Sequence, residues 1–263
     1  MKAYEKLKEA RRQDRPTASS YIDKIFTSKI ELHGDRAFGD DPAMLGGIGF
    51  LGDIPVTYIA TERGVATEER IRRNFGCPKP EGYRKAKRLM LQAEKFSRPV
   101  VTFVDTSGAF CGVEAEERGQ GQAIADSIEC MMGLKVPIIS IIIGEGESGG
   151  ALGIAAADSV YMLRNAVYSV ISPEGCAGIL MKDSSRAAES AEDLKLTSDS
   201  IKNLGAAERI IEENFDAFGD MCEGMRNLLI RDITKLSVLD TEQLCEKRFR
   251  RYADMGDSLR IIV

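Results

Sequence analysis

Residues 100–157 constrain the fold more than any other stretch, because two apolar runs are each followed by a loop rich in small residues. The first run, residues 100–104, reads Val-Val-Thr-Phe-Val and leads into Asp105-Thr-Ser-Gly-Ala-Phe-Cys-Gly. The second run, residues 136–143, is apolar at nearly every position, which is typical of a central strand buried on both faces. We expect a helix over residues 114–132 between the two strands.

The second strand leads into a glycine loop, residues 144–150, which reads Gly-Glu-Gly-Glu-Ser-Gly-Gly. The small-residue run 151–157 that follows predicts a buried helix packed on the sheet. A glycine loop between a strand and a helix points several backbone N–H groups into one space. Such donors suit the stabilisation of a negative charge, although a tight turn that lets helix and sheet approach closely would need the same glycines.

Two short motifs in this loop suggest other chemistries. The spacing Gly144-x-Gly-x-x-Gly matches a dinucleotide fingerprint, but the next strand ends in Arg164-Asn rather than in the acid that binds ribose. The pattern Gly-x-Ser148-x-Gly matches a hydrolase nucleophile elbow, which needs a histidine. The only histidine, His33, lies far upstream in a polar stretch that predicts a surface turn. Main-chain donors need neither partner.

The composition excludes several classes of function. With 36 basic and 41 acidic residues the net charge is −5, which argues against a general nucleic-acid binder. The chain has no apolar run of membrane-spanning length and its first residues resemble no signal peptide. Six cysteines without a C-x-x-C pair, beside one histidine, predict reduced thiols in a cytoplasmic protein and no metal on this chain.

Residues 70–88 form a basic segment in this acidic protein, with eight Lys or Arg residues and one acid, Glu81. The segment predicts either a site for an anionic ligand or acidic partner, or a solvated face of the helix expected over residues 81–96. Arg72, Arg73 and Lys79 lie in its less regular, proline-containing part and are the candidate ligand contacts. A second basic cluster, residues 247–251, is expected to be a solvated face.

The rest of the chain alternates strands and helices, which predicts a mainly parallel α/β fold. Residues 44–50 and 56–60 predict a hairpin. Further strands are expected at 159–163, 166–171 and 207–211, and further helices at 1–13, 17–26, 176–180, 184–194, 197–204, 215–236 and 241–255.

Several long motifs occur together and in one order. They are Arg72-Arg-Asn-Phe-Gly, Pro80-Glu-Gly-Tyr-Arg-Lys-Ala, Asp105-Thr-x-Gly-Ala, Ala115-Glu-Glu-Arg-Gly-Gln, Ile143-Gly-Glu-Gly-x-Ser-Gly-Gly-Ala and Tyr168-Ser-Val-Ile-Ser-Pro-Glu-Gly-Cys-Ala. Together they resemble the alpha-subunit family of the carboxyltransferase of bacterial multisubunit acetyl-CoA carboxylase. The resemblance covers residues 15–212 and continues more loosely to residue 252.

The resemblance implies a crotonase-like superhelix of ββα units with peripheral helices. It implies one carboxyltransferase domain over residues 1–263, with N-terminal helices in 1–30, the core in 31–212 and C-terminal helices in 213–263. The implied reaction transfers the carboxyl group of carboxybiotin, carried on the biotin carboxyl carrier protein, to acetyl-CoA. It gives malonyl-CoA, in the first committed step of fatty acid synthesis.

The implied partners are a zinc-ribbon beta subunit, in an α2β2 assembly with the active site between the subunits, the carrier protein and biotin carboxylase. The family's glycine pair falls on Gly149 and Gly150, whose amides would hold the oxygen of the biotin ureido enolate. Gly108 and Ala109 are implied to bind substrate.

This chain departs from the family pattern at Ser107, Phe110, Cys111 and Glu147, and Glu147, where the family has glycine, adds a charge beside the glycine pair. Two other functions stay open from the residues: a stand-alone crotonase-type acyl-CoA hydrolase or hydratase, and a non-catalytic scaffold.

Overall fold

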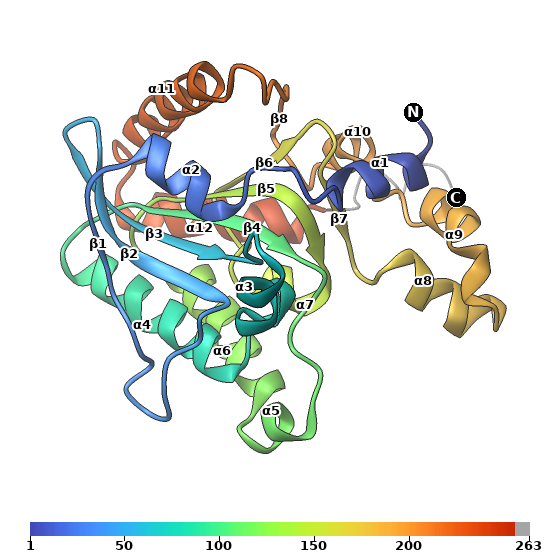
Figure 1. Ribbon diagram of the computed structural model, residues 1–263. Helices are drawn as coiled ribbons and strands as arrows, with labels where there is room; N and C mark the ends of the chain where they lie inside the picture. Colours follow the sequence, from blue (N-terminus) through green and yellow to red (C-terminus); the bar gives the residue numbers. More distant parts are fainter. Residues whose placement is uncertain (256–263) are drawn as a thin grey trace.

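The computed structural model describes residues 1–255, and an eight-stranded mixed sheet forms the centre of the molecule (Figure 1). The strand order is β1-β2-β3-β4-β5-β6-β8, and β7 pairs with the end of β5. The strands from β3 onward are mutually parallel, which confirms the predicted α/β class. These are β3 (Ile54–Thr61), β4 (Val100–Thr106), β5 (Ile138–Glu147), β6 (Ser159–Leu163), β7 (Val167–Ser169) and β8 (Arg209–Ile211).

An antiparallel ribbon closes one edge of the sheet. The predicted hairpin is confirmed: β2 (Met44–Leu51) pairs with β3 through a turn in which Gly52 has φ +62°. Beyond it lies an edge strand that the sequence did not predict, β1 (Thr27–Glu31), whose five residues are all exposed.

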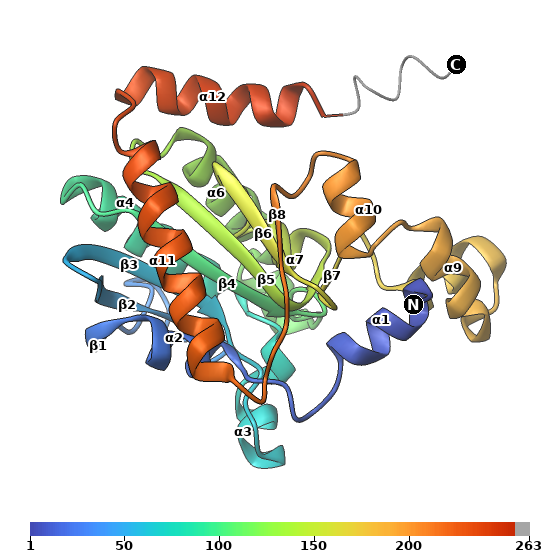
Figure 2. The same cartoon turned by 90° about the horizontal axis from the view of Figure 1, so that it is seen from above.

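Helices cover both faces of the sheet (Figures 1 and 2). On one face α4 (Pro80–Lys95) packs against α6 (Gln120–Gly133), and α4 buries the predicted apolar stripe that includes Tyr83, Ala86 and Met90. On the other face α2 (Ala18–Ile25) packs against α11 (Phe218–Leu236). The long helix α12 (Thr241–Ala253) contacts α6, and residues 256–263 of the expected C-terminal region lie outside the described residues.

A smaller helical lobe extends from the carboxyl end of β5, on the right of Figure 1. It has its own apolar cluster, in which Leu7 packs with Val167, Ala191 and Leu196. The lobe therefore joins the N-terminus to residues that lie far along the chain. Its elements are α1 (Ala3–Ala10), α8 (Pro173–Cys176), the π-helical turn η2 (Ala177–Met181), the 3-10 turn η3 (Ser184–Arg186), α9 (Ala187–Asp193) and α10 (Ser198–Asn203).

Several predicted boundaries were wrong. The helix expected over 114–132 is two helices, α5 (Val113–Glu117) and α6, because Gly119 adopts φ +80° between them. Much of the expected glycine loop is strand, because the last residues of β5, which ends at Glu147, pair with β7. The helix expected over 151–157 was also misplaced: α7 spans Ser148–Leu152, and residues 153–157 form turns and irregular backbone. The remaining short elements, α3 (Thr67–Arg72) and η1 (Asn74–Gly76), precede α4.

The prediction of a solvated face over residues 247–251 was wrong for Arg248, which has an exposed fraction of 0%. Its guanidinium forms an ion pair with Asp158 (Nε to Oδ1, 2.8 Å) and anchors α12 to the sheet. Arg251 likewise turns inward, to Glu208. The prediction failed because α12 packs against α6, so the positions of this basic cluster that face the rest of the molecule are buried.

Within residues 1–255, no helix combines the length and the apolar character that crossing a membrane requires.

Candidate active site at the carboxyl end of β5

The glycine pair lies where β5 ends and α7 begins. The chain turns within one residue, because Glu147 is the last residue of β5 and Ser148 the first of α7. Ser148 has φ +60°, a conformation that a residue with a side chain adopts only where its surroundings impose it. The first N–H groups of a helix have no partner within it, so the amides of Gly149 and Gly150 are available as donors.

Gly150 lies directly against the loop that follows β4. A Cβ atom at position 150 would come within 3.0 Å of the backbone of Gly108 and Ala109, closer than real Cβ atoms approach, so only glycine fits. On the other side, the Tyr83 hydroxyl donates to the Gly150 carbonyl at 3.0 Å. The structure thus brings together four of the predicted site residues: Gly108, Ala109, Gly149 and Gly150.

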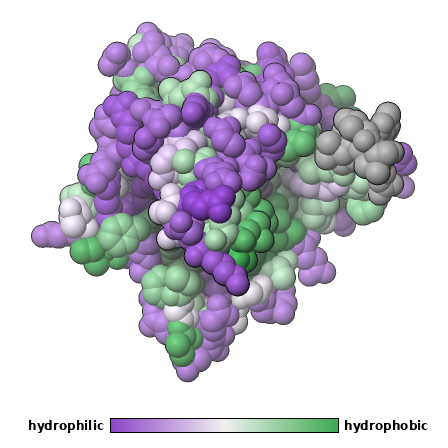
Figure 3. Space-filling view, turned by 90° about the vertical axis from the view of Figure 1, so that its right-hand side faces the viewer, coloured by the Kyte–Doolittle hydropathy of each residue, from purple (hydrophilic) through white to green (hydrophobic). Residues whose placement is uncertain are grey.

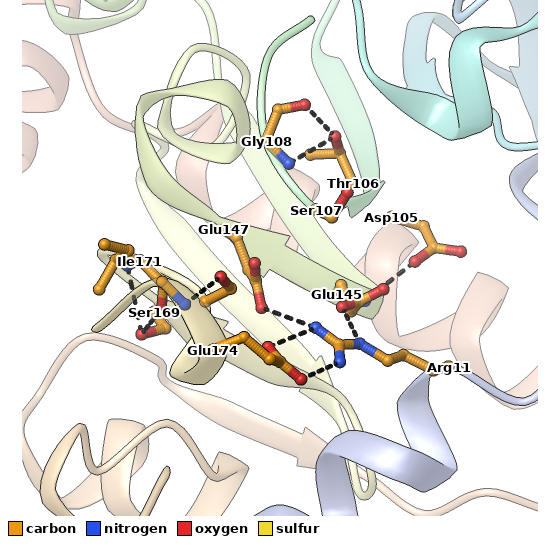
Figure 4. A network of polar contacts seen from close by, with 12 residues as sticks. Arg11, Asp105, Thr106, Ser107, Gly108, Glu145, Glu147, Ser169, Ile171 and Glu174 are labelled. Carbon is orange, nitrogen blue, oxygen red and sulfur yellow. Dashed lines mark hydrogen bonds and ion pairs between the residues drawn. The ribbon is translucent and has the colours of Figure 1, made fainter. Parts of the chain in front are cut away.

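The loop itself is held by Thr106, at the end of β4. Its Oγ1 donates to the Gly108 carbonyl at 2.7 Å and accepts from the Gly108 amide at 3.1 Å (Figure 4). Gly108 has φ +137°, which L side chains rarely adopt. The backbone conformation at position 108 therefore requires glycine, whether or not this residue also contacts a substrate.

Beside Gly149 lies an open apolar cavity of about 270 Å³. Its wall comes mainly from α7 and β7, with Ile201 of α10, and Val170 on its rim is 75% exposed. Figure 3, which looks at the side that carries α8 and α9, shows apolar side chains gathered between polar ones. The lining residues are Ser148, Gly149, Leu152, Tyr168, Ser169, Val170, Ile201 and Ala206.

A group of charges, buried except at Arg11 and Glu174 and here called the β5 ion cluster, lies at the same end of the sheet (Figure 4). Arg63 bridges Asp105 and Glu145, with Nη2 at 2.7 Å and 2.9 Å from their carboxylate oxygens. Arg11 of α1 bridges Glu145 and Glu174 of α8, at 2.6 Å and 2.7 Å. The cluster thereby ties α1 and α8 of the lobe to the end of β5. Its members are Arg11, Arg63, Asp105, Glu145, Glu147 and Glu174.

Glu147 is the member of this cluster with the poorest partners. Its exposed fraction is 0%, and among the described residues neither of its carboxylate oxygens finds a hydrogen-bond partner. The Arg11 guanidinium lies 3.9 Å away. Burial, with a smaller contribution from the neighbouring Glu145 charge, raises the pKa of Glu147 to about 8.

Two carboxyl groups of the same cluster shift in opposite directions. Burial raises the pKa of Asp105, against the opposing charge of Arg63. Burial is the largest influence on Glu174 and acts to raise its pKa, but the hydrogen bond and charge of Arg11 and a backbone hydrogen bond together outweigh burial, and the pKa is lowered. Sequence reasoning noticed Glu147 only as a departure, and it missed Arg11 and Arg63. No local pattern marks those arginines, because their partners lie far along the chain, from Asp105, which follows Arg63 by 42 residues, to Glu174, which follows Arg11 by 163.

The basic segment is mostly used by the fold. On α4, Arg84 pairs with Asp35 and Lys85 with Asp40, both in the turn before β2. Arg73 is also engaged internally, since it pairs with Glu69 and donates to the Pro42 carbonyl.

The other two candidate contacts are more accessible. Arg72 is exposed at the end of α3. Lys79 pairs with Glu114 at 2.6 Å and lies 4.8 Å from the centre of the Phe110 ring, which places it beside the loop that carries Gly108 and Ala109. Arg72 and Lys79 thus remain the candidates for contact with an anion.

The hydrolase elbow finds no support in the positions of its parts. His33, 62% exposed at its side chain, lies in the turn between β1 and β2 with Nδ1 3.0 Å from Asp40. This turn packs on α4, since Arg88 donates to the His33 carbonyl, whereas Ser148 lies at the carboxyl end of β5. In the part of the chain that the structure describes, no group of three or more His, Cys, Asp or Glu residues is arranged to hold a metal ion.

Comparison with protein families identifies a match over residues 1–256, to the family described as acetyl co-enzyme A carboxylase carboxyltransferase-like. The acetyl-coenzyme A carboxylase carboxyl transferase subunit alpha of Ruminiclostridium cellulolyticum is 57% identical over 256 residues. The match covers 97% of this chain and 98% of that protein.

One further relative and one solved structure extend the comparison. A protein of Natranaerobius thermophilus named acetyl-coenzyme A carboxylase carboxyl transferase subunits beta/alpha is 52% identical over 257 residues, which are 96% of this chain and 42% of its own length. Among solved structures, transcarboxylase 12S, crystallised with methylmalonyl-coenzyme A, superposes with a TM-score of 0.70 at 19% identity. That match covers 86% of this chain and 44% of the other, and it shows a shared fold.

Proposed function

This chain belongs to the acetyl-CoA carboxylase carboxyltransferase family, with the crotonase-like fold of carboxyltransferases, and we propose that it performs carboxyl transfer at the junction of β5 and α7. The family and its relatives give the function in outline: this is the alpha subunit of an acetyl-CoA carboxylase carboxyltransferase, an enzyme of fatty acid synthesis that uses carboxybiotin as co-substrate. The residues that carry the reaction on this chain are the proposal.

The observation that carries the proposal is the close approach of Gly150 to the backbone of Gly108 and Ala109. Carboxybiotin supplies the carboxyl group, and its departure leaves negative charge on an oxygen. The amides of Gly149 and Gly150, at the start of α7, are preorganised donors for that charge. The apolar cavity beside Gly149 has room for the body of a bicyclic ring, and its few polar atoms fit such a guest.

Main-chain donors also account for the chemistry without a protein base. A hydrolase would need Ser148 to be activated by a histidine, and His33 lies in the turn between β1 and β2. The family and the geometry therefore favour carboxyl transfer over a stand-alone acyl-CoA hydrolase or hydratase.

The partners follow from the same premise. We propose that a zinc-ribbon beta subunit completes the site in an α2β2 assembly, served by the biotin carboxyl carrier protein and biotin carboxylase in the cytoplasm. The relative whose name joins beta and alpha subunits in one chain supports this pairing. Residues 1–263 would act as one carboxyltransferase domain, with Arg72 and Lys79, and less directly Arg73, offered to the phosphates of CoA.

The test compares the variants Gly150→Ala and Gly47→Ala in a complex reconstituted with the beta subunit. Both place a Cβ within 3.0 Å of backbone atoms, but Gly47 is in β2, against Ile30, away from the proposed site. We expect Gly150→Ala to lower the rate of malonyl-CoA formation by about 10²–10³, the usual loss when an oxyanion donor is displaced. Gly47→Ala should lose stability only.

Thermal melting of both variants separates misfolding from loss of the site. Ser148→Ala, which keeps every amide, should retain most of the activity, whereas a hydrolase would lose nearly all of it. A folded Gly150→Ala protein with full activity would refute the role of the glycine pair, as would a dead Ser148→Ala protein.

A further inference from the structure

Glu147 is a buried carboxyl group without a close cationic partner among the described residues, and the proposed reaction does not use it. Four carboxyl groups of the β5 ion cluster face two guanidinium groups, those of Arg11 and Arg63. Arg63 makes its close contacts with Asp105 and Glu145, and Arg11 makes its close contacts with Glu145 and Glu174. If Glu147 were ionised, no cation of this cluster would make a close contact with its carboxylate.

The neighbours of Glu147 come from every element packed around it. Glu145 lies on its own strand, Glu174 on α8 and Arg11 on α1, and Arg63 follows β3. Two of these groups are acids, so they oppose a charge on Glu147, while the two arginines favour it from a greater distance than their own partners. A carboxylate that is 0% exposed and without hydrogen bonds is costly to ionise, and the neutral acid is therefore its stable form near neutral pH.

The position of Glu147 links this charge to the glycine pair. It is the N-cap residue of α7, two positions before Gly149. A negative charge at the start of a helix attracts the same N–H groups that an anionic substrate would need. The same charge would repel an oxyanion forming at those groups.

We propose that Glu147 is a positioning residue for carboxyl transfer: it works as a neutral acid, and loss of its proton to solvent weakens Gly149 and Gly150 as donors. This inference rests on the proposed role of the glycine pair.

The first test is the pH profile of kcat, measured between about pH 6 and pH 10 on the complex reconstituted with the beta subunit. The wild-type kcat should fall with an apparent pKa near 8, and Glu147→Gln should lack this step. The ratio of the variant's kcat to that of the wild type should rise about tenfold or more across the interval. Glu189→Gln, which removes an acid whose side chain is 55% exposed on α9, should keep the wild-type step.

A second variant moves the step instead of removing it. Glu174→Gln deletes a neighbouring acid and releases Arg11, so the pKa of Glu147 should fall and the step should shift to lower pH. A step that persists unchanged in Glu147→Gln would overturn the proposal, as would a Glu174→Gln profile shifted to higher pH.

Thermal melting of the full chain tests the charge state without reference to catalysis. Because folding raises the pKa of Glu147, the wild type loses stability as pH rises from the ordinary glutamate pKa to about 8. The melting temperature of Glu147→Gln, relative to the wild type, should therefore increase over that interval. A constant difference would overturn the proposal.

The two readouts separate this inference from the function on which it rests. If the glycine pair has no catalytic role, Gly150→Ala stays active while the melting difference of Glu147→Gln still grows with pH. If the positioning role alone is wrong, Gly150→Ala is inactive and Glu147→Gln keeps the wild-type step in kcat.

Discussion

The two ends of β5 both bury charge, and they do so in opposite ways. At the amino end, Asp158 and Arg248 form a pair in which both side chains are 0% exposed. At the carboxyl end, the β5 ion cluster holds several charges around Glu147. One strand thus joins a charge network whose polar atoms are all paired to one in which some are not. The first stabilises the fold, and the second adjoins the site of the proposed reaction.

The amino end is fully satisfied. Asp158 accepts from the Ile138 amide at 2.7 Å and from Arg248 Nε and Nη2 at 2.8 Å and 2.9 Å. The remaining Arg248 donors reach the carbonyls of Met131, Leu134 and Val136. A buried ion pair tolerates its desolvation only when its polar atoms are paired in this way.

At the carboxyl end, several buried polar atoms of the described residues lack hydrogen-bond partners. Across residues 1–255, the buried side-chain atoms without hydrogen-bond partners include both carboxylate oxygens of Glu147 and Nε of Arg63. Next to Glu147, Ser148 adopts a strained φ, and Gly150 lies so close to the backbone of Gly108 that a Cβ atom would not fit between them. Strain and unpaired polar groups tend to persist where function requires them, and here Glu147 and Ser148 directly precede the glycine pair.

Breaking the closed end should have the largest effect on stability. Arg248→Met leaves Asp158 as an uncompensated buried charge, and we expect a loss of about 3–5 kcal/mol in the free energy of unfolding. Urea denaturation measures it. Arg250→Met, which removes an exposed partner of Glu246 on the same helix, is the matched control and should change little. Equal stability of the two variants would mean that the buried pair does not anchor α12.

Removing an ion pair from the β5 ion cluster should lower the free energy of unfolding by less. Arg11→Met removes the link from α1 to Glu145 and Glu174, but Arg11 is 34% exposed, so water replaces part of what is lost. We expect a loss of about 1–3 kcal/mol, typical of hydrogen bonds to charged groups. The pKa of Glu147 should also rise, because Arg11 lowers it, and the step in kcat should move to higher pH. A step at lower pH would contradict this account, and the exposed Arg12→Met provides the control.

The carboxyl end should also be the end that recruits anions. Arg72→Gln combined with Lys79→Gln should raise the KM for acetyl-CoA about three- to tenfold at low salt, and less at high salt, where the ionic term is screened. Steady-state kinetics of the reconstituted complex at two ionic strengths measure it. Lys235→Gln, on the exposed face of α11, should have no effect. An unchanged KM at low salt would show that both basic side chains are only solvated.

Relaxing the strain at Ser148 should have the smallest effect. Ser148→Gly removes the Cβ from a residue with φ +60°, and we expect a gain of about 0.5–1 kcal/mol, with carboxyl transfer retained. Ser28→Gly relieves a similar φ of +48° in β1 and should give a similar gain far from the site. Thermal melting compares the two. A loss of stability in Ser148→Gly alone would mean that the hydroxyl holds the turn.

The sequence by itself determined the elements that depend on local pattern. Its apolar run 136–143 predicted the central strand, and the stripe on residues 81–96 predicted α4 with its buried face. The family resemblance located the glycine pair, and the local pattern of a buried strand followed by glycines predicted a strand-to-helix turn with free amides at the same place. The long motifs identified the family because they are read along the chain.

Tertiary structure alone decided which charges face one another. Lys247, Arg248 and Arg251 read alike in the sequence, yet Arg248 is completely buried because Asp158, 90 residues earlier, lies beneath α12. Glu145 and Glu147 are also alike in the sequence, but Arg11 and Arg63 reach the first and leave the second without close partners. Electrostatic energies depend on burial and on distances through space, and neither is encoded in the order of neighbouring residues.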